Sequence, residues 1–181
     1  APLGLGWVYA NQNNHTEAIK YYDQILSFNP NHMLALISKG NSLSGLGKFD
    51  EAMAIFQKAK KLYPDNEYID AEIGLIQYNK GNFTAAEQSF RKALMKNNET
   101  YTCPYEGLGL VYYKQGKFDE AKLNLEKSIS INPDIEYKKY NALAKIYIQK
   151  GKIDEAKKLL QKSIENYPYE SEAKRLLDSL D

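Results

Sequence analysis

Four glycines recur along the chain at a nearly constant interval, and this spacing limits the possible folds more than any other feature. Gly47, Gly81, Gly116 and Gly151 stand 34, 35 and 35 residues apart, and an alanine follows five residues after each of them. A period of this length indicates an array of small structural units rather than one globular core. The 181 residues of the chain hold about five such units.

Each unit is predicted to be a pair of helices joined by a short turn. In the fourth unit, Tyr105, Leu108 and Tyr112 lie at helical spacing and predict one apolar face on a first helix. Gly116 is expected to end that helix, because glycine adopts the left-handed backbone conformation of a helix end without steric cost. In the first unit Asn13 takes the same place, and asparagine also tolerates this conformation.

The turn between the two helices carries the stretch Gly-Lys-Phe-Asp-Glu-Ala, which occurs at 47–52 and 116–121, with a near copy at 151–156. An aspartate or threonine after the turn can accept a hydrogen bond from the free amides of a helix start, so we expect it to cap the second helix. The expected capping residues are Thr16, Asp50, Thr84, Asp119 and Asp154. A helix pair this short cannot bury its own apolar face, and each unit must stack on the next. The sequence therefore predicts an all-α fold, an α-solenoid of antiparallel helix pairs.

These positions resemble the tetratricopeptide repeat, whose pattern contains an aromatic residue, Leu-Gly, Tyr, Ala, Phe and Pro. The fourth unit carries the pattern as Tyr105, Leu108-Gly109, Tyr112, Ala121, Leu125 and Pro133. The resemblance implies a right-handed superhelix whose first helices line a concave groove that binds a peptide or a segment of another protein. We expect five repeats in residues 1–168, at about 1–32, 33–66, 67–101, 102–136 and 137–170, and a capping helix at 169–181.

A second line of side chains runs along the first helices, beside the packing face, and is the predicted peptide-binding site. Its members are Trp7, Asn41, Tyr68, Leu75, Tyr78, Leu110, Tyr113, Lys138, Asn141 and Lys145. Good aromatic anchors contribute on the order of 2 kcal/mol or more each to binding, so the aromatic members are the preferred contacts. The two asparagines are expected to bond an extended peptide backbone, and the two lysines an acidic group. The alternative is that the apolar members pack against neighbouring first helices and that the lysines form a solvated face.

The sequence predicts no enzyme, and we expect neither a cofactor nor a metal site. Gly47-Lys48 resembles the end of a phosphate-binding loop, but Phe49 stands where the magnesium-binding hydroxyl belongs. His15 and His32 fall in the turns of different units without metal-ligand spacing, and we expect both to be solvated.

Charge and hydropathy bear on the class of partner. The 24 basic residues nearly balance the 23 acidic ones, so no broad field attracts nucleic acid. No apolar run is long enough to span a bilayer, and the first residues lack the pattern of a signal peptide. We therefore expect a protein or peptide partner, no direct membrane insertion and a cytoplasmic location. The helical pattern is under way by Leu5 without an initial Met, which suggests a piece of a longer protein.

Three functions are consistent with these patterns. The first is a binding module that acts as a scaffold or adaptor and holds a partner segment in its groove. The second is a structural solenoid that self-associates through its open first repeat. The third is the targeting arm of a larger enzyme whose catalytic domain lies elsewhere.

Overall fold

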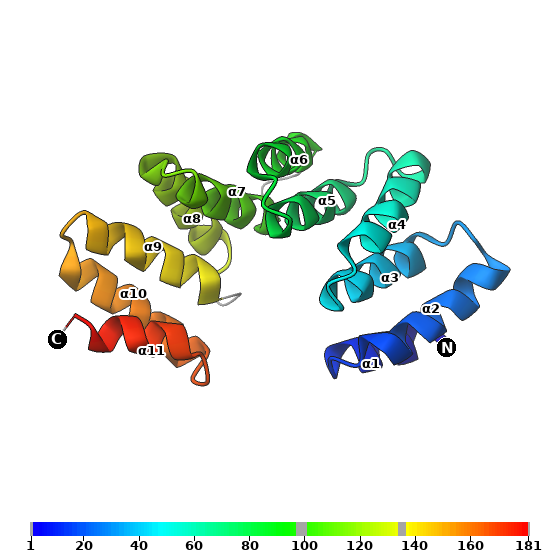
Figure 1. The fold of residues 1–181 in the computed structure, drawn as a ribbon, viewed down its shortest axis with the longest axis horizontal. Coiled ribbons are helices and arrows are strands. Elements are labelled where there is room, and N and C mark those ends of the chain that lie inside the picture. The colour runs from blue at the N-terminus through cyan, green and yellow to red at the C-terminus, as the bar shows by residue number, and fades with distance from the viewer. Residues whose placement is uncertain (1, 97–100, 134–136, 181) are drawn as a thin grey trace. The chain divides into compact units, whose positions relative to one another are not determined.

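The structure is a computed structural model that describes residues 2–96, 101–133 and 137–180. Every regular element within these residues is an α-helix, and successive helices form antiparallel pairs (Figure 1). The chain divides into two compact units, an N-terminal unit of residues 1–96 and a C-terminal unit of residues 97–181. The predicted all-α fold is confirmed.

The described residues of the N-terminal unit form three helix pairs. They are α1 (Pro2–Asn11) with α2 (His15–Phe28), α3 (Met33–Gly45) with α4 (Phe49–Leu62), and α5 (Glu67–Asn79) with α6 (Phe83–Lys96). Each pair stacks on the next, because α2 contacts α3 and α4 contacts α5. The first helices also touch in succession, α1 against α3 and α3 against α5, and they form one continuous layer of this unit.

In the C-terminal unit, residues 101–133 and 137–180 form two helix pairs and one further helix. They are α7 (Cys103–Lys114) with α8 (Phe118–Ile131), α9 (Tyr137–Gln149) with α10 (Ile153–Asn166), and α11 (Ser171–Asp178). Within this unit α7 contacts α9, and α10 contacts α11. Ala173 of α11 is fully buried against Ala156 and Leu160, and Leu176 and Leu177 pack on the same cluster. The last helix therefore covers the apolar edge of the final pair.

The turn inside each pair uses the left-handed backbone that the sequence predicts. Gly47, Gly81, Gly116 and Gly151 have φ values of 73°, 78°, 74° and 70°, and Asn13 has a φ of 59°. This conformation lets the amide of the residue after the glycine donate to a carbonyl in the last turn of the helix. Lys48 N, for example, donates to Leu43 O at 2.9 Å. The expectation that glycine ends the first helix is confirmed.

A small residue on each first helix faces a large one on its partner helix. A Cβ atom built on Gly40 would lie 2.6 Å from the ring of Phe56, and one on Gly109 would lie 2.6 Å from Leu125. Gly6 faces Tyr22 and Gly74 faces Phe90 in the same way. These contacts explain the Leu-Gly positions of the sequence pattern, because the two helix axes approach too closely for a side chain.

The aspartates and threonines after the turns lie inside the second helices and do not cap them, so that prediction is wrong for all five residues, which are Thr16, Asp50, Thr84, Asp119 and Asp154. The residues at the cap positions are Asn14, Lys48, Lys117 and Lys152, of which Asn14 makes a side-chain cap bond, to Glu17 N. Asp50 and Asp119 lie within the first turn, where negative charge suits the helix dipole. Asp50 instead pairs with Lys80 Nζ of the next repeat at 2.6 Å, and Asp119 pairs in the same way with Lys150.

Hydrogen bonds to loop carbonyls join successive repeats of the N-terminal unit. Lys58 Nζ donates to Pro30 O at 2.7 Å, and the Tyr63 hydroxyl donates to Asn31 O. Asp70, whose side chain is 5% exposed, is paired with Lys60 Nζ at 2.5 Å and with Lys96 Nζ at 3.0 Å. The junction between α4, α5 and α6 thus holds a buried carboxylate between two ammonium groups.

Candidate functional site

The layer of first helices in the N-terminal unit presents side chains that the packing between helix pairs does not bury. We define the first-helix surface by the predicted residues on α1, α3 and α5, which are Trp7, Asn41, Tyr68, Leu75 and Tyr78. Trp7, Asn41 and Leu75 occupy the same position in three successive repeats, because they are 34 residues apart. Since α3 touches both α1 and α5, the surface is continuous across the three helices.

Trp7 is the aromatic residue of this surface with the best-defined orientation. Its indole Nε1 donates to Ser38 Oγ of α3 at 2.9 Å, while 45% of the side chain remains exposed. Ser38 lies three residues before Asn41 of the predicted line but is not a member of that line. The hydrogen bond restricts the orientation of the indole ring.

Two more members of the first-helix surface face solvent. Tyr68, near the start of α5, is 50% exposed, and Asn41 on α3 is also exposed. Leu75 on α5 is partly buried. A large aromatic ring and an amide group on adjacent helices offer apolar contact together with donors and acceptors for a peptide backbone.

Tyr78 and its counterpart Tyr113 on α7 are both partly buried against the first residue of the following helix. The ring centroids of Tyr78 and Phe83 are 5.7 Å apart, and those of Tyr113 and Phe118 are 5.8 Å apart, both in tilted arrangements. Burial raises the pKa of the Tyr78 hydroxyl above its ordinary value. Both tyrosines therefore contribute to packing within their own repeat, and part of each ring remains at the surface.

Asn141 and Lys145 of α9 belong to a polar network in the C-terminal unit. Asn141 is 1% exposed, its Oδ1 accepts from Ser163 Oγ at 2.9 Å, and its Nδ2 donates to Glu170 and Glu172 at 3.2 Å each. Lys145 Nζ is 2.6 Å from Glu172 Oε1. The acidic group that the sequence led us to expect at Lys145 is thus present within the chain itself, at the start of α11.

The carboxylates of this network are held in their ionised form. The hydrogen bond from Lys145 holds the pKa of Glu172 below its ordinary value, against the opposing effect of burial. Burial also opposes ionisation of Glu170, but hydrogen bonds from Ala173 N, Glu172 N and Asn141 together lower the pKa of its carboxyl. The network therefore ties α11 to α9 with charged groups at neutral pH.

The two other predicted residues of the C-terminal unit lie at its surface. Lys138, at the start of α9, is exposed, and Leu110 on α7 is partly buried. Leu110 and Lys145 stand at the repeat position that Trp7 occupies in the first repeat. The aromatic and amide character of the N-terminal unit therefore gives way to an aliphatic and basic character in the C-terminal unit.

The histidines have structural roles. His32 is the cap residue of α3 and its Nδ1 accepts a hydrogen bond from Ala35 N at 3.2 Å, while His15 Nε2 lies 3.0 Å from Asn13 Oδ1 and packs against Gly45. The prediction that both are simply solvated is wrong, because each is partly buried. Within the described residues, no three side chains of His, Cys, Asp or Glu are grouped to hold a metal ion. In the same residues, no helix has the length and apolar character needed to cross a bilayer.

The repeat pattern matches known family models over most of the chain. One model described as tetratricopeptide repeat matches residues 3–67 and 37–102, and a second with that description matches residues 112–180. The chain belongs to the tetratricopeptide repeat family. Tetratricopeptide repeats are in general protein-interaction scaffolds, and this coarse function follows from the family.

Curated relatives with tetratricopeptide repeats are much longer than this chain. The human protein O-mannosyl-transferase TMTC1 is 29% identical over 94 residues, which are 50% of this chain and 11% of the relative. The human superkiller complex protein 3 is 33% identical over 97 residues, which are 54% of this chain and 6% of the relative. The chain thus spans about a tenth or less of the length of these two proteins.

The fold also matches a solved tetratricopeptide repeat structure along its length. TTC0263, a thermophilic tetratricopeptide repeat protein of Thermus thermophilus, has a TM-score of 0.81 and 22% sequence identity. The match covers 99% of this chain and 96% of that one. At this identity the likeness shows the fold alone, and it confirms the predicted α-solenoid of tetratricopeptide repeats.

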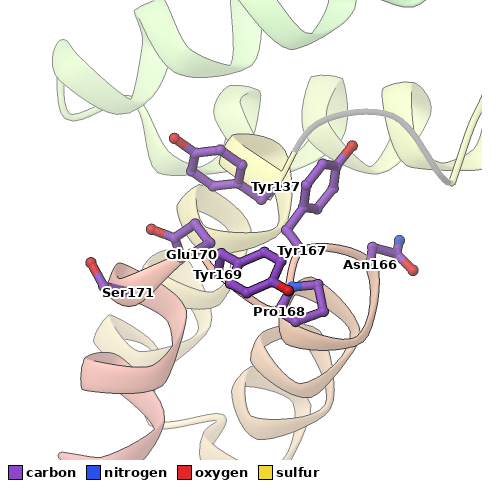
Figure 2. Close-up of a pocket in the computed structure, with 7 residues that line it drawn as sticks. All are labelled: Tyr137, Asn166, Tyr167, Pro168, Tyr169, Glu170 and Ser171. Atoms are coloured by element: carbon purple, nitrogen blue, oxygen red, sulfur yellow. The ribbon is translucent and has the colours of Figure 1, made fainter.

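One feature of the C-terminal tetratricopeptide repeat was missed by the sequence reasoning. A cavity of about 620 Å³ lies where the loop between α10 and α11 meets the start of α9. It is lined by Tyr137, Asn166, Tyr167, Pro168, Tyr169, Glu170 and Ser171 (Figure 2). The Tyr-Pro-Tyr stretch at the end of the fifth repeat was the available signal, but the sequence reasoning used it only as the end of the repeat.

Proposed function

We propose that the first-helix surface of the N-terminal unit binds an extended segment of a partner protein, and that the chain acts as a scaffold or adaptor. The observation that carries this proposal is the exposed indole of Trp7, held in place by Ser38. An aromatic ring that is already oriented binds with little loss of conformational freedom. Trp7 and Tyr68 are proposed as the anchoring contacts.

The polar members of the surface complete the proposed site. Asn41 on α3 would bond the peptide backbone of the bound segment, and Leu75 and Tyr78 on α5 would add apolar contact. In the C-terminal unit we propose Leu110, Tyr113 and Lys138 as contacts of the same kind. Asn141 and Lys145 can join them only by exchanging the carboxylates of Glu170 and Glu172 for groups of the ligand.

The experiment uses Trp7 as its own reporter, since it is the only tryptophan of the chain. Peptides selected from a random displayed library against the 181-residue chain are titrated while tryptophan emission is recorded. Binding at the proposed site is expected to change the emission of Trp7 in a saturable way. Tyr68→Ala is expected to weaken binding about tenfold or more, the effect of losing a good aromatic anchor.

Phe28→Ala is the matched control. Phe28 is 91% exposed but lies on α2, a second helix, so its loss is expected to leave the affinity unchanged. Two results would contradict the proposal: selected peptides that leave the Trp7 emission unchanged, or equal losses of affinity in Tyr68→Ala and Phe28→Ala.

A second candidate function is self-association through α1. Leu5 and Val8 are 49% and 52% exposed and lie three residues apart, so they share one face of this helix. A second copy covering this face would make the mass measured by light scattering rise with concentration, and Leu5→Ser with Val8→Ser would abolish the rise. The name of the transferase relative also keeps open a role as one arm of a larger enzyme.

A further inference from the structure

The cavity in the C-terminal unit is built from aromatic rings and contains none of the residues of the first-helix surface. Figure 2 shows the rings of Tyr137, Tyr167 and Tyr169 gathered around one space, with Glu170 at its edge. Tyr137 and Tyr167 meet edge to face, with ring centroids 5.6 Å apart and an interplanar angle of 64°. This contact holds two rings of the cavity in a fixed geometry.

Tyr169 forms the solvent-exposed wall of this cavity. Its side chain is 100% exposed, although it follows Pro168, which restricts the backbone on either side of the peptide bond between them. Three rings facing one space form the arrangement that binds cations through the negative faces of the π-systems.

The charge of the cavity favours a cation. Among its seven lining residues, Glu170 is the one with a formal charge, since a carboxyl whose pKa lies below 4.5 is fully ionised at neutral pH. Glu170 Oε1 accepts from Glu172 N at 2.7 Å, and Oε2 accepts from Ala173 N at 2.7 Å and from Asn141 Nδ2 at 3.2 Å. A carboxylate has about four acceptor positions, so one position on Oε1 remains for a ligand.

An anionic ligand is disfavoured by the same contacts. The amides at the start of α11 would attract an anion, but Glu170 already occupies those of Glu172 and Ala173. The nearby Lys139 is fully buried and donates to Asn132 O, so its ammonium group is directed to that carbonyl. Arg175 donates to Ser171 O at 3.3 Å from the next turn of α11.

From this geometry we infer that the cavity binds the guanidinium group of an arginine side chain of a partner protein. A guanidinium is planar and stacks on aromatic rings, and its N–H groups can also donate to a carboxylate beside the rings. The combination of tyrosine faces with one open acceptor position on Glu170 fits this group better than a compact ammonium. The site goes beyond the peptide surface proposed above and shares no residue with it.

The test uses a short probe on the whole 181-residue chain. Acetyl-Gly-Arg-Gly-amide is titrated while the backbone amide spectrum is recorded by NMR. The matched probe carries citrulline, which has the shape of arginine without its charge. The arginine probe is expected to shift the amide signals of the non-proline residues in 166–171 with a dissociation constant on the order of 1 mM. The citrulline probe is expected to bind at least about fivefold more weakly.

Variants separate this site from the first-helix surface. Tyr169→Ala changes a fully exposed side chain, so it is expected to leave the fold intact and to weaken binding of the arginine probe about fivefold. Glu170→Gln is expected to weaken it as well, while Tyr68→Ala is expected to leave it unchanged. Equal binding of the arginine and citrulline probes, no saturable shift of residues 166–171, or full binding by Tyr169→Ala would each overturn the inference.

Discussion

The contact between Gly40 and Phe56 provides a quantitative test of how the helix pairs pack. In a helix interior, alanine is favoured over glycine by about 1 kcal/mol, so Gly40→Ala would stabilise the protein if the new methyl group had room. The new Cβ atom would instead lie 2.6 Å from two atoms of the Phe56 ring. Carbon atoms rest about 3.5 to 4.0 Å apart, so the ring would have to move by roughly 1 Å.

The structure predicts that the clash outweighs the gain in helix propensity. Phe56 is fully buried in a cluster with Leu36, Ala52 and Ile69, which limits its movement. Overpacking in a core costs about 1 to 3 kcal/mol, and we expect a cost of about 2 to 3 kcal/mol at this fully buried ring. The gain in helix propensity of about 1 kcal/mol offsets part of that cost, so the net destabilisation is about 1 to 2 kcal/mol. The measurement is urea unfolding followed by circular dichroism at the helical band.

A control and a rescue make this prediction refutable. Gly4 lies in α1, and a Cβ atom added there would have nothing within 4 Å, so Gly4→Ala is expected to leave stability unchanged or slightly raised. In the last pair, Ala144 and Leu160 occupy the positions of Gly40 and Phe56, so Gly40→Ala combined with Phe56→Leu imitates a pairing that the chain already uses. The loss of stability in the double variant should be smaller than the sum of the losses in the two single variants by about 1 kcal/mol or more. If Gly40→Ala is as stable as Gly4→Ala, or if the two changes are additive, the packing argument fails.

Two further predictions concern charged groups. Asp70→Asn is expected to lower the free energy of unfolding by about 2 kcal/mol, because it leaves Lys60 and Lys96 without their carboxylate. The control is Asp23→Asn, which removes the ion pair between Lys39 and an aspartate that is 51% exposed and should lower the free energy of unfolding by under about 1 kcal/mol. Both values are measured by urea unfolding. For the α11 network the folded pKa values of Glu170 and Glu172 lie below the ordinary value of 4.5, so its stabilisation is complete above pH 4.5 and is lost as the pH falls through the folded values. The Cα chemical shifts of α11 should lose their helical character in that range before those of α9 do, and simultaneous loss would contradict this.

The features that the sequence predicts correctly depend on local geometry. Gly47 and Asn13 stand where the chain must take a positive φ, and few residues tolerate that conformation. Gly74 stands where a partner helix allows no side chain, and the helical spacing of the pattern marks that face. These constraints act within one repeat, so one sequence is enough to identify them.

The features that the sequence did not reveal depend on neighbouring repeats. Asp50 is of a residue type that often caps helices, but its side chain bonds to Lys80, 30 residues away. The burial of Asn141 results from α11, whose glutamates lie about 30 residues further along the chain. These partners come together only through the stacking of helices from different parts of the chain.

The contacts within each unit join helices that are one or two places apart along the chain, and this has a mechanical consequence. A pulling force applied at the two ends of a unit loads its junctions in series, so the weakest junction yields first while the others stay closed. The hydrogen bond from Lys58 to Pro30 holds the junction of the first and second repeats, and the pairing of Asp70 with Lys60 and Lys96 holds that of the second and third. Each junction can therefore open and reform by a local search. We expect such a unit to extend stepwise under tension. It should also refold quickly after the tension is released, because the contacts that must re-form join segments that are close in sequence.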